Sequence, residues 1–108
     1  MIRRGMLYWV VMPNEKQRPA LVLSHDRRNE LASNIVVVPC SSQLRFGPWH
    51  VELSKKESGL SAPSVLRCED IQTVSKDRVR TPAIGGPLSA TRLEEVRRAL
   101  LSALAFES

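Results

Sequence analysis

The sequence has few of the residues that mark metal sites, phosphate loops or membrane spans. Its two cysteines and two histidines show no close metal-ligand spacing, so we expect no metal and no other cofactor. The glycine pair at positions 85 and 86 precedes Pro87 and lacks the lysine of a P-loop. No apolar run approaches the roughly 20 residues that span a bilayer, and the N-terminus shows no signal-peptide cleavage site. We therefore expect a cytoplasmic protein.

What remains is the composition of a globular domain. Hydrophobic residues make up 43% of the chain and charged residues 25%, with both signs mixed along it. A length of 108 residues is ordinary for one core, so we expect a single domain over 1–108. The 16 lysines and arginines exceed the 11 acidic residues and give a net charge of +5. This charge favours polyanionic partners, or it serves solubility alone.

Short runs rich in Val, Leu, Ile and aromatic residues recur along the chain, with turn signals such as "MPNE", "RFGP" and "IGGP" between them. This pattern predicts a compact antiparallel β domain, most simply a small closed or half-closed barrel that hides its strand edges. The predicted strands are 7–12, 19–24, 34–39, 49–54 and 64–74.

The period of the apolar residues changes near the C-terminus. From Thr91 onward the spacing predicts an amphipathic helix packed on the barrel, and Thr91 with Glu94 matches a capping box. A further helical turn is expected at 26–33. The predicted apolar face of the long helix comprises Leu93, Val96, Leu100 and Leu104.

Cysteines and aromatic residues are assigned mainly to packing. In a cytoplasmic protein Cys40 and Cys68 are expected to be reduced thiols, although both lie in predicted strands that could be neighbours, so a disulfide stays open. Tyr8 and Trp9 are expected in the core. Trp49 serves packing, a base platform or a dimer contact.

Arg18 stands directly before Pro19 and an apolar run in "NEKQRPALVLS". Proline biases the preceding residue toward an extended conformation, so we expect Arg18 to project where the strand enters the barrel. A guanidinium there can hold a phosphate with two parallel hydrogen bonds and stays charged at any working pH. The alternative is a surface salt bridge.

Hydroxyl groups follow the predicted strand in "VVVPCSSQLR". Ser41, Ser42 and Gln43 are expected at a rim, where such groups bond a phosphate oxygen or a nucleotide edge. The alternative is a turn in which the serines satisfy their own backbone.

A third candidate segment is "VLRCEDIQTV". Strand alternation would place Arg67 and Glu69 on one face, with Leu66, Cys68 and Asp70 on the other. The pair would then be a cation beside a possible proton acceptor. The alternative is a cross-strand ion pair of little energetic value.

Taken in order, "RRGMLYWVVM", "RPALVLSHD", "VVVPCSSQ", "PWHVEL", "GLSAPSVLRCEDIQTVSKDRV" and "IGGPLS" resemble the MazF/PemK family of toxin endoribonucleases. The resemblance covers nearly the whole chain. It implies a mainly β fold, an SH3-like β-barrel of the plasmid-maintenance toxin type with a C-terminal helix. It also implies a homodimer, metal-independent and sequence-specific cleavage of single-stranded RNA, and a cognate MazE-like antitoxin whose acidic tail occupies the RNA groove.

The resemblance also implies roles for individual residues. The family's catalytic arginine falls on Arg18 and its catalytic threonine on Ser41, which keeps the hydroxyl and loses a methyl group. In the PemK branch an arginine and an acidic residue two positions later act at the scissile phosphate, and Arg67 and Glu69 match this pattern. Residues expected to contact RNA are Gln17, Ser42, Gln43, Arg45, His50, Gln72 and Lys76.

The expected reaction uses the ribose 2′-OH as nucleophile and leaves a 2′,3′-cyclic phosphate and a 5′-OH. Arginine is almost never deprotonated, so Glu69 is the first candidate for the proton acceptor and His50 the second. One alternative is a non-enzymatic toxin of the CcdB type that binds a protein such as DNA gyrase, which would need the fold but not Arg18 or Ser41. Another is an RNA-binding module without turnover.

Overall fold

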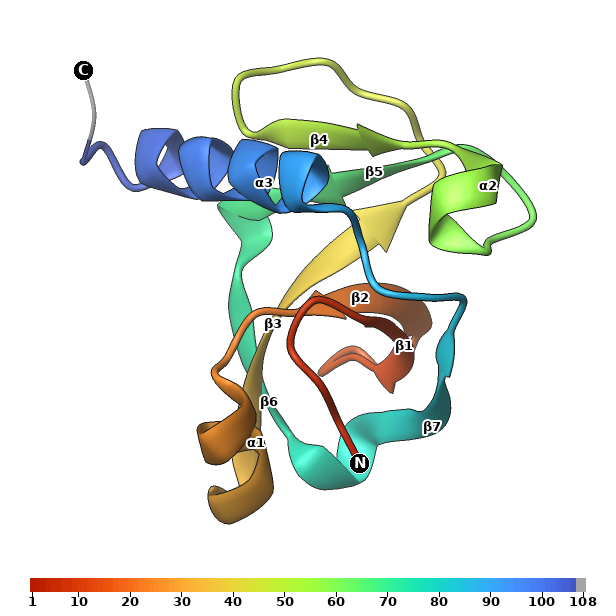
Figure 1. Ribbon diagram of the computed structural model, residues 1–108, viewed down its shortest axis with the longest axis vertical. Coiled ribbons are helices and arrows are strands. Elements are labelled where there is room, and N and C mark those ends of the chain that lie inside the picture. The colour runs from red at the N-terminus through yellow and green to blue at the C-terminus, as the bar shows by residue number, and fades with distance from the viewer. Residues whose placement is uncertain (107–108) are drawn as a thin grey trace.

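The computed structural model describes residues 1–106 as a β structure with one long helix at its C-terminal end (Figure 1). The strands are β1 (Leu7–Val11), β2 (Gln17–Val22), β3 (Asn34–Ser41), β4 (His50–Leu53), β5 (Ser64–Arg67), β6 (Gln72–Ser75) and β7 (Val79–Ile84). The helical segments are α1 (Asp26–Leu31), α2 (Lys55–Ser58), η1 (Cys68–Asp70), η2 (Lys76–Arg78) and α3 (Ala90–Ala103). No helix within residues 1–106 is long and apolar enough to cross a membrane.

The sheet is organised around β3, because β2, β5 and β6 all pair with it. β2 runs antiparallel to β3 from Val37 to Pro39 on one edge. On the other edge, β6 pairs with 34–37 and β5 pairs with Cys40 and Ser41. The order is β4-β5-β3-β2-β1-β7, so the strand pairs among the described residues leave the ring open between β4 and β7. The expected barrel is therefore present in its open form.

Apolar residues on both faces of the strands build two clusters. Alternate residues of β1 enter different clusters, since side chains point to opposite faces along a strand. One cluster lies under α3 and includes Leu7, Leu21, Val38, Leu66 and Val96. The other is formed mainly by β1, β2, β3 and β6 and includes Tyr8, Val10, Val22, Ile35 and Val74.

The long helix is confirmed, but its start differs from the prediction. The Ser89 hydroxyl accepts a hydrogen bond from the Arg92 backbone N–H, so Ser89 is the N-cap, and the predicted capping box of Thr91 and Glu94 is wrong. Leu104 is 54% exposed because it follows the last helical residue. The face that packs on the barrel comprises Leu93, Val96, Ala99 and Leu100.

The predicted strand 64–74 is two strands, β5 and β6, with the 3-10 turn η1 between them. Arg67 ends β5 and Glu69 lies in η1, so their placement on one strand face is wrong. The break arises because β5 and β6 pair with different parts of β3. The sequence also does not predict β7, whose Pro82 is tolerated because β7 is an edge strand.

Three other expectations are decided by burial and bonding. The helical turn at 26–33 is confirmed as α1, and Cys40 and Cys68 are both buried free thiols, so the disulfide left open above is not formed. Tyr8 is in the core at 2% exposure. Trp9 is 43% exposed, which makes its assignment to the core wrong, and Trp49 is 40% exposed.

Candidate active site

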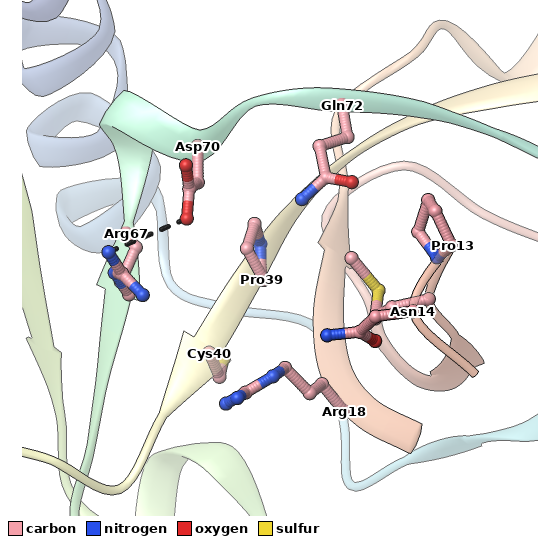
Figure 2. A pocket seen from close by; sticks show the side chains of 9 residues that line it. Pro13, Asn14, Arg18, Pro39, Cys40, Arg67, Asp70 and Gln72 are labelled. Atoms are coloured by element: carbon pink, nitrogen blue, oxygen red, sulfur yellow. Dashed lines mark ion pairs between the residues drawn. The ribbon is translucent and has the colours of Figure 1, made fainter. Parts of the chain in front are cut away.

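A gap opens over β3, between β2 on one edge and the turn η1 on the other, where β6 gives way to β5. On one edge, β2 pairs with β3 only as far as Ala20 and Pro39. On the opposite edge, the partner of β3 changes from β6, which pairs up to Val37, to β5, which pairs with Cys40 and Ser41. Arg18 precedes Ala20 by two residues and lies beyond the end of the β2–β3 ladder. Its side chain therefore extends into the gap (Figure 2).

Arg67 reaches the same gap from the other side, because β5 ends there and η1 turns the chain toward β6. Figure 2 shows the two guanidinium groups on either side of Cys40. The gap is a pocket of about 270 Å³, here called the arginine pocket. It is lined by Met12, Pro13, Asn14, Arg18, Pro39, Cys40, Arg67, Asp70 and Gln72.

The two arginines differ in what holds them. Among residues 1–106 the Arg18 guanidinium has no hydrogen-bond or ion-pair partner, so the salt-bridge alternative is wrong. Arg67 Nη2 lies 3.5 Å from Asp70 Oδ2 and 3.8 Å from Glu69 Oε2. Two guanidinium groups that line one small pocket favour an anion between them.

Glu69 is hydrogen-bonded to His50. His50 is the register partner of Arg67 in the β4–β5 pair. His50 Nε2 donates a hydrogen bond of 2.9 Å to Glu69 Oε2. Burial acts to raise the pKa of Glu69, but the His50 hydrogen bond, a backbone hydrogen bond and the nearby charges together hold it below its usual value. The carboxylate is therefore ionised at neutral pH, and its Oε1 is buried without a partner in the described chain.

Ser41 is 8% exposed, and its hydroxyl accepts a hydrogen bond of 3.1 Å from the Gln43 backbone N–H. The structure thus shows the turn that was the alternative for this segment. The hydroxyl hydrogen is still available to donate, since a serine oxygen can accept and donate at once. Ser41 is not one of the residues that line the arginine pocket, although its neighbour Cys40 is.

The residues expected to contact RNA fall into two groups. Gln72 lines the arginine pocket, and Gln17 and Ser42 line an adjacent pocket that also contains Arg18. The others lie outside both pockets. His50 faces a cavity beside α3, Lys76 donates to the Glu30 carbonyl beyond the far end of β6, and the exposed loop after β3 holds Gln43 and Arg45.

Sequence reasoning missed two parts of this site. Asp70 was assigned to the opposite strand face, but η1 brings it to the pocket wall (Figure 2). The β1–β2 turn forms another wall, and Arg78 holds it by donating to the carbonyls of Val11 and Met12 at 3.2 and 3.1 Å. The role of Asp70 could have been found from "RCED", because two adjacent acidic residues leave open which of them faces the arginine. No local sequence pattern predicts that the β1–β2 turn forms a wall of the pocket.

The two thiols near the site are not ionised. Burial raises the pKa of Cys40 and of Cys68 to about 12 in each case. A thiol with so high a pKa is a poor nucleophile at neutral pH. Cys40 therefore contributes surface to the pocket wall and no charge.

The fold and the paired arginines define a small β-barrel protein with a rim site suited to a phosphate-bearing ligand. The family described as PemK-like, MazF-like toxin of type II toxin-antitoxin system matches residues 3–104. Endoribonuclease MazF9 of Mycobacterium tuberculosis is 32% identical over 112 residues, which cover 93% of each chain. The chain therefore belongs to the PemK/MazF family and is a toxin endoribonuclease of a toxin-antitoxin system.

Solved structures share this fold. The Mycobacterium tuberculosis toxin MazF-mt6 has a TM-score of 0.84 at 23% identity and covers 95% of this chain and 99% of its own. A MazE-MazF structure from Deinococcus radiodurans has a TM-score of 0.79 at 27% identity over 95% and 94%. A mycobacterial endoribonuclease in complex with its cognate antitoxin has a TM-score of 0.84 at 21% identity over 100% and 99%. These similarities confirm the predicted fold class.

Proposed function

We propose that this toxin cleaves single-stranded RNA at short specific sequences without a metal ion. The ribose 2′-OH loses its proton and attacks the adjacent phosphorus, and the bond from phosphorus to the 5′ oxygen of the next nucleotide breaks. The leaving oxygen takes up a proton. The products are a 2′,3′-cyclic phosphate and a 5′-OH end.

The observation that carries this proposal is the pair of arginines at one small pocket. Negative charge grows on the nonbridging oxygens as the 2′ oxygen attacks, and Arg18 and Arg67 come from different strands to reach that charge. Arg18 has no competing partner within the described chain, so it is free to bind the phosphate. Loss of one such donor typically costs about 100- to 1000-fold in kcat.

Ser41 is proposed to orient the phosphate. Its oxygen is fixed by the N–H of Gln43, and this leaves the O–H to donate to a phosphate oxygen. Its position next to Cys40, which lines the arginine pocket, is consistent with that role.

Glu69 is proposed as the acceptor of the 2′-OH proton. The carboxylate is ionised, and its Oε1 has a free lone pair beside Arg67, whose Nε also lacks a partner in the described chain. A buried polar atom without a partner costs about 1–3 kcal/mol. A ribose hydroxyl and a phosphate oxygen would supply the missing partners of both residues once RNA binding exposes these two buried atoms.

His50, the second candidate from the sequence, does not line the arginine pocket. Asp70 is a further candidate for the proton acceptor, because it lines this pocket and Glu69 does not. The two acidic residues are separated by comparing Glu69→Gln with Asp70→Asn. The variant that removes the acceptor loses the low-pH limb of the kcat/KM profile, and the other keeps it.

The expected partners also belong to this proposal. A MazE-like antitoxin with an acidic extended segment is proposed to cover the groove, which fits the net charge of +5 and the arginines in the pocket. The mycobacterial relative described above was solved with its cognate antitoxin. A homodimer and a cytoplasmic location remain predictions.

The test is to incubate the purified, antitoxin-free protein with a long single-stranded RNA in EDTA. Fragment ends are mapped by primer extension, and end groups are identified chemically. Arg18→Ala and Arg67→Ala are compared with Arg98→Ala, which removes an exposed arginine of α3 far along the chain from the site. We expect discrete cuts with cyclic-phosphate ends, at least about 100-fold slower in the first two variants only.

Three results would contradict the proposal. A folded wild-type protein that cuts no RNA would favour a toxin that binds a protein. Cutting that EDTA abolishes would show a metal requirement. Cutting that persists when the scissile ribose is replaced by 2′-deoxyribose would exclude the 2′-OH as nucleophile.

A further inference from the structure

Trp9 lies on the face of β1 that packs under α3, and it lines a pocket together with Arg18. It shares this face with Leu7, two residues earlier, which is fully buried in the cluster under α3. The apolar cluster that buries Leu7 does not extend as far as Trp9, which is 43% exposed. In the flanking strands Pro19 of β2 and Arg80 of β7 are its register partners. The backbone of Trp9 is thus fixed between two neighbouring strands, while part of the residue's surface faces solvent.

The exposed indole lines a pocket of about 500 Å³, here called the Trp9 pocket. This pocket and the arginine pocket have Arg18 and Cys40 in common, so they form one depression with Arg18 between its two halves. The Trp9 pocket combines a flat aromatic surface with hydrogen-bonding groups and a cation. Its further lining includes Lys16, Gln17, Pro19, Ser42 and Leu60.

We propose that the Trp9 pocket binds the unpaired base of a nucleotide that flanks the scissile phosphate, with the base stacked on the indole. This inference rests on the proposed cleavage of RNA, because Arg18 is taken to hold the scissile phosphate at the boundary of the two pockets. The base next to that phosphate then enters one pocket or the other. Single-stranded RNA is commonly recognised by splayed bases that stack on aromatic side chains.

The other lining residues suit a nucleotide. Gln17 and Ser42 offer donors and acceptors to the edge of a stacked base, and Lys16 offers a positive charge to the RNA backbone. Stacking alone tolerates any base, since every base has a π face. Gln17 and Ser42 therefore determine which base is preferred, and Trp9 supplies affinity.

Trp49 provides a matched control. Its exposed fraction, 40%, is close to that of Trp9, but it lines neither of the two pockets. The chain contains two tryptophans, so each single replacement leaves one reporter. Trp49→Phe keeps only Trp9, and Trp9→Phe keeps only Trp49.

The probe is an RNA oligonucleotide that spans a cut site mapped with the wild-type protein, with 2′-deoxyribose at the scissile position so that it is bound but not cut. We expect this probe to quench the fluorescence of Trp49→Phe and to leave that of Trp9→Phe nearly unchanged. Trp9→Ala should weaken binding by about 5- to 100-fold, Trp9→Phe by less, and Trp49→Ala hardly at all.

A double-mutant cycle assigns the base. Abasic nucleotides are placed one at a time beside the scissile phosphate, and affinity is measured for the wild type and for Trp9→Ala. At one position the abasic change should weaken wild-type binding and have no further effect in Trp9→Ala. This position names the nucleotide that occupies the Trp9 pocket.

The failure of this inference is distinguishable from that of the proposed function. If the wild type cuts RNA while Trp9→Ala is folded and keeps its affinity and cut sites, the inference alone is overturned. If the wild type cuts no RNA, both are overturned. If Trp9→Ala does not fold, the fluorescence of Trp49→Phe decides, and no quenching overturns the inference. Trp9→Ala could instead lose self-association while its RNA affinity per folded protomer stays unchanged. This result would overturn the inference and show that the Trp9 pocket binds a second copy of the chain.

Discussion

The Nε2 atom of His50 lies 2.9 Å from Oε2 of Glu69, and this contact is the largest of the effects that favour the ionised carboxylate against burial. The two residues come from different elements, β4 and η1. His50 also faces Arg67 across the β4–β5 pair, so one histidine lies beside both members of the Arg67–Glu69 pair. Its contribution to the site is therefore expected to be indirect.

His50→Ala should raise the pKa of Glu69, because it removes the hydrogen bond that lowers it. If Glu69 accepts the 2′-OH proton, the low-pH limb of the kcat/KM profile moves to higher pH, and activity falls more at about pH 5 than at about pH 7. His25→Ala is the control, because His25 caps α1 on the surface. An unchanged profile in a folded His50→Ala would show that Glu69 is not the acceptor.

Arg78→Ala should loosen the wall of the arginine pocket formed by the β1–β2 turn. Arg78 donates to the carbonyls of Val11 and Met12, and Met12 lines the pocket. A hydrogen bond from a charged group contributes about 1.5 kcal/mol or more, so kcat/KM should fall roughly tenfold, mainly through KM. Hydrogen exchange over 12–16 should accelerate in parallel. Unchanged exchange and KM in the variant, with Arg98→Ala as reference, would contradict this role.

Glu57→Gln should reduce stability at neutral pH but not in acid. The hydrogen bond from Arg92 is the main cause that lowers the pKa of Glu57 below its ordinary value of 4.5. Its stabilising effect is therefore present above about pH 4.5 and is lost as the pH falls through the lower folded-state pKa. Glutamine keeps the capping box with Ser54 and removes only the charge.

Urea unfolding checks this prediction. We expect Glu57→Gln to cost about 0.5–1 kcal/mol at pH 7 and much less at an acid pH below the lowered folded-state pKa of Glu57, where the wild type has lost the same charge. Glu52→Gln, at an exposed position of β4, is the matched control. An equal loss at both pH values would contradict the role of the charge.

Gly59→Ala should destabilise the fold. Gly59 ends α2 with a φ of 78°, and a Cβ added there would lie 3.0 Å from the Gly85 Cα. Both the left-handed conformation and the close backbone approach oppose a side chain, so we expect a loss of about 1–3 kcal/mol. Gly86→Ala should be nearly neutral, because nothing lies within 4 Å of its added Cβ. Equal urea midpoints for the two variants would refute this account.

Local sequence patterns do not predict the structure of the run 64–74 or the exposure of Trp9. The run 64–74 has strand composition throughout, yet it breaks at η1 because its two halves pair with different parts of β3. That break moves Asp70 to the pocket wall. Trp9 is an aromatic residue in an apolar strand and is therefore predicted in the core, but the apolar cluster that buries Leu7 on the same face does not extend over it. Neither outcome is encoded within a window of neighbouring residues.

The amino-acid sequence by itself determined the antiparallel β character, the C-terminal amphipathic helix and the position of Arg18 at the start of a strand, because side-chain period, turn residues and the effect of Pro19 are local properties. Only the tertiary structure decided that Arg18 and Arg67 share one pocket, that His50 holds Glu69 and that Trp9 lines the adjoining pocket. The physical reason is that the pairing of β2 ends on one edge of β3 close to the point where β6 gives way to β5 on the other edge, and both depend on pairing between strands far apart in the chain.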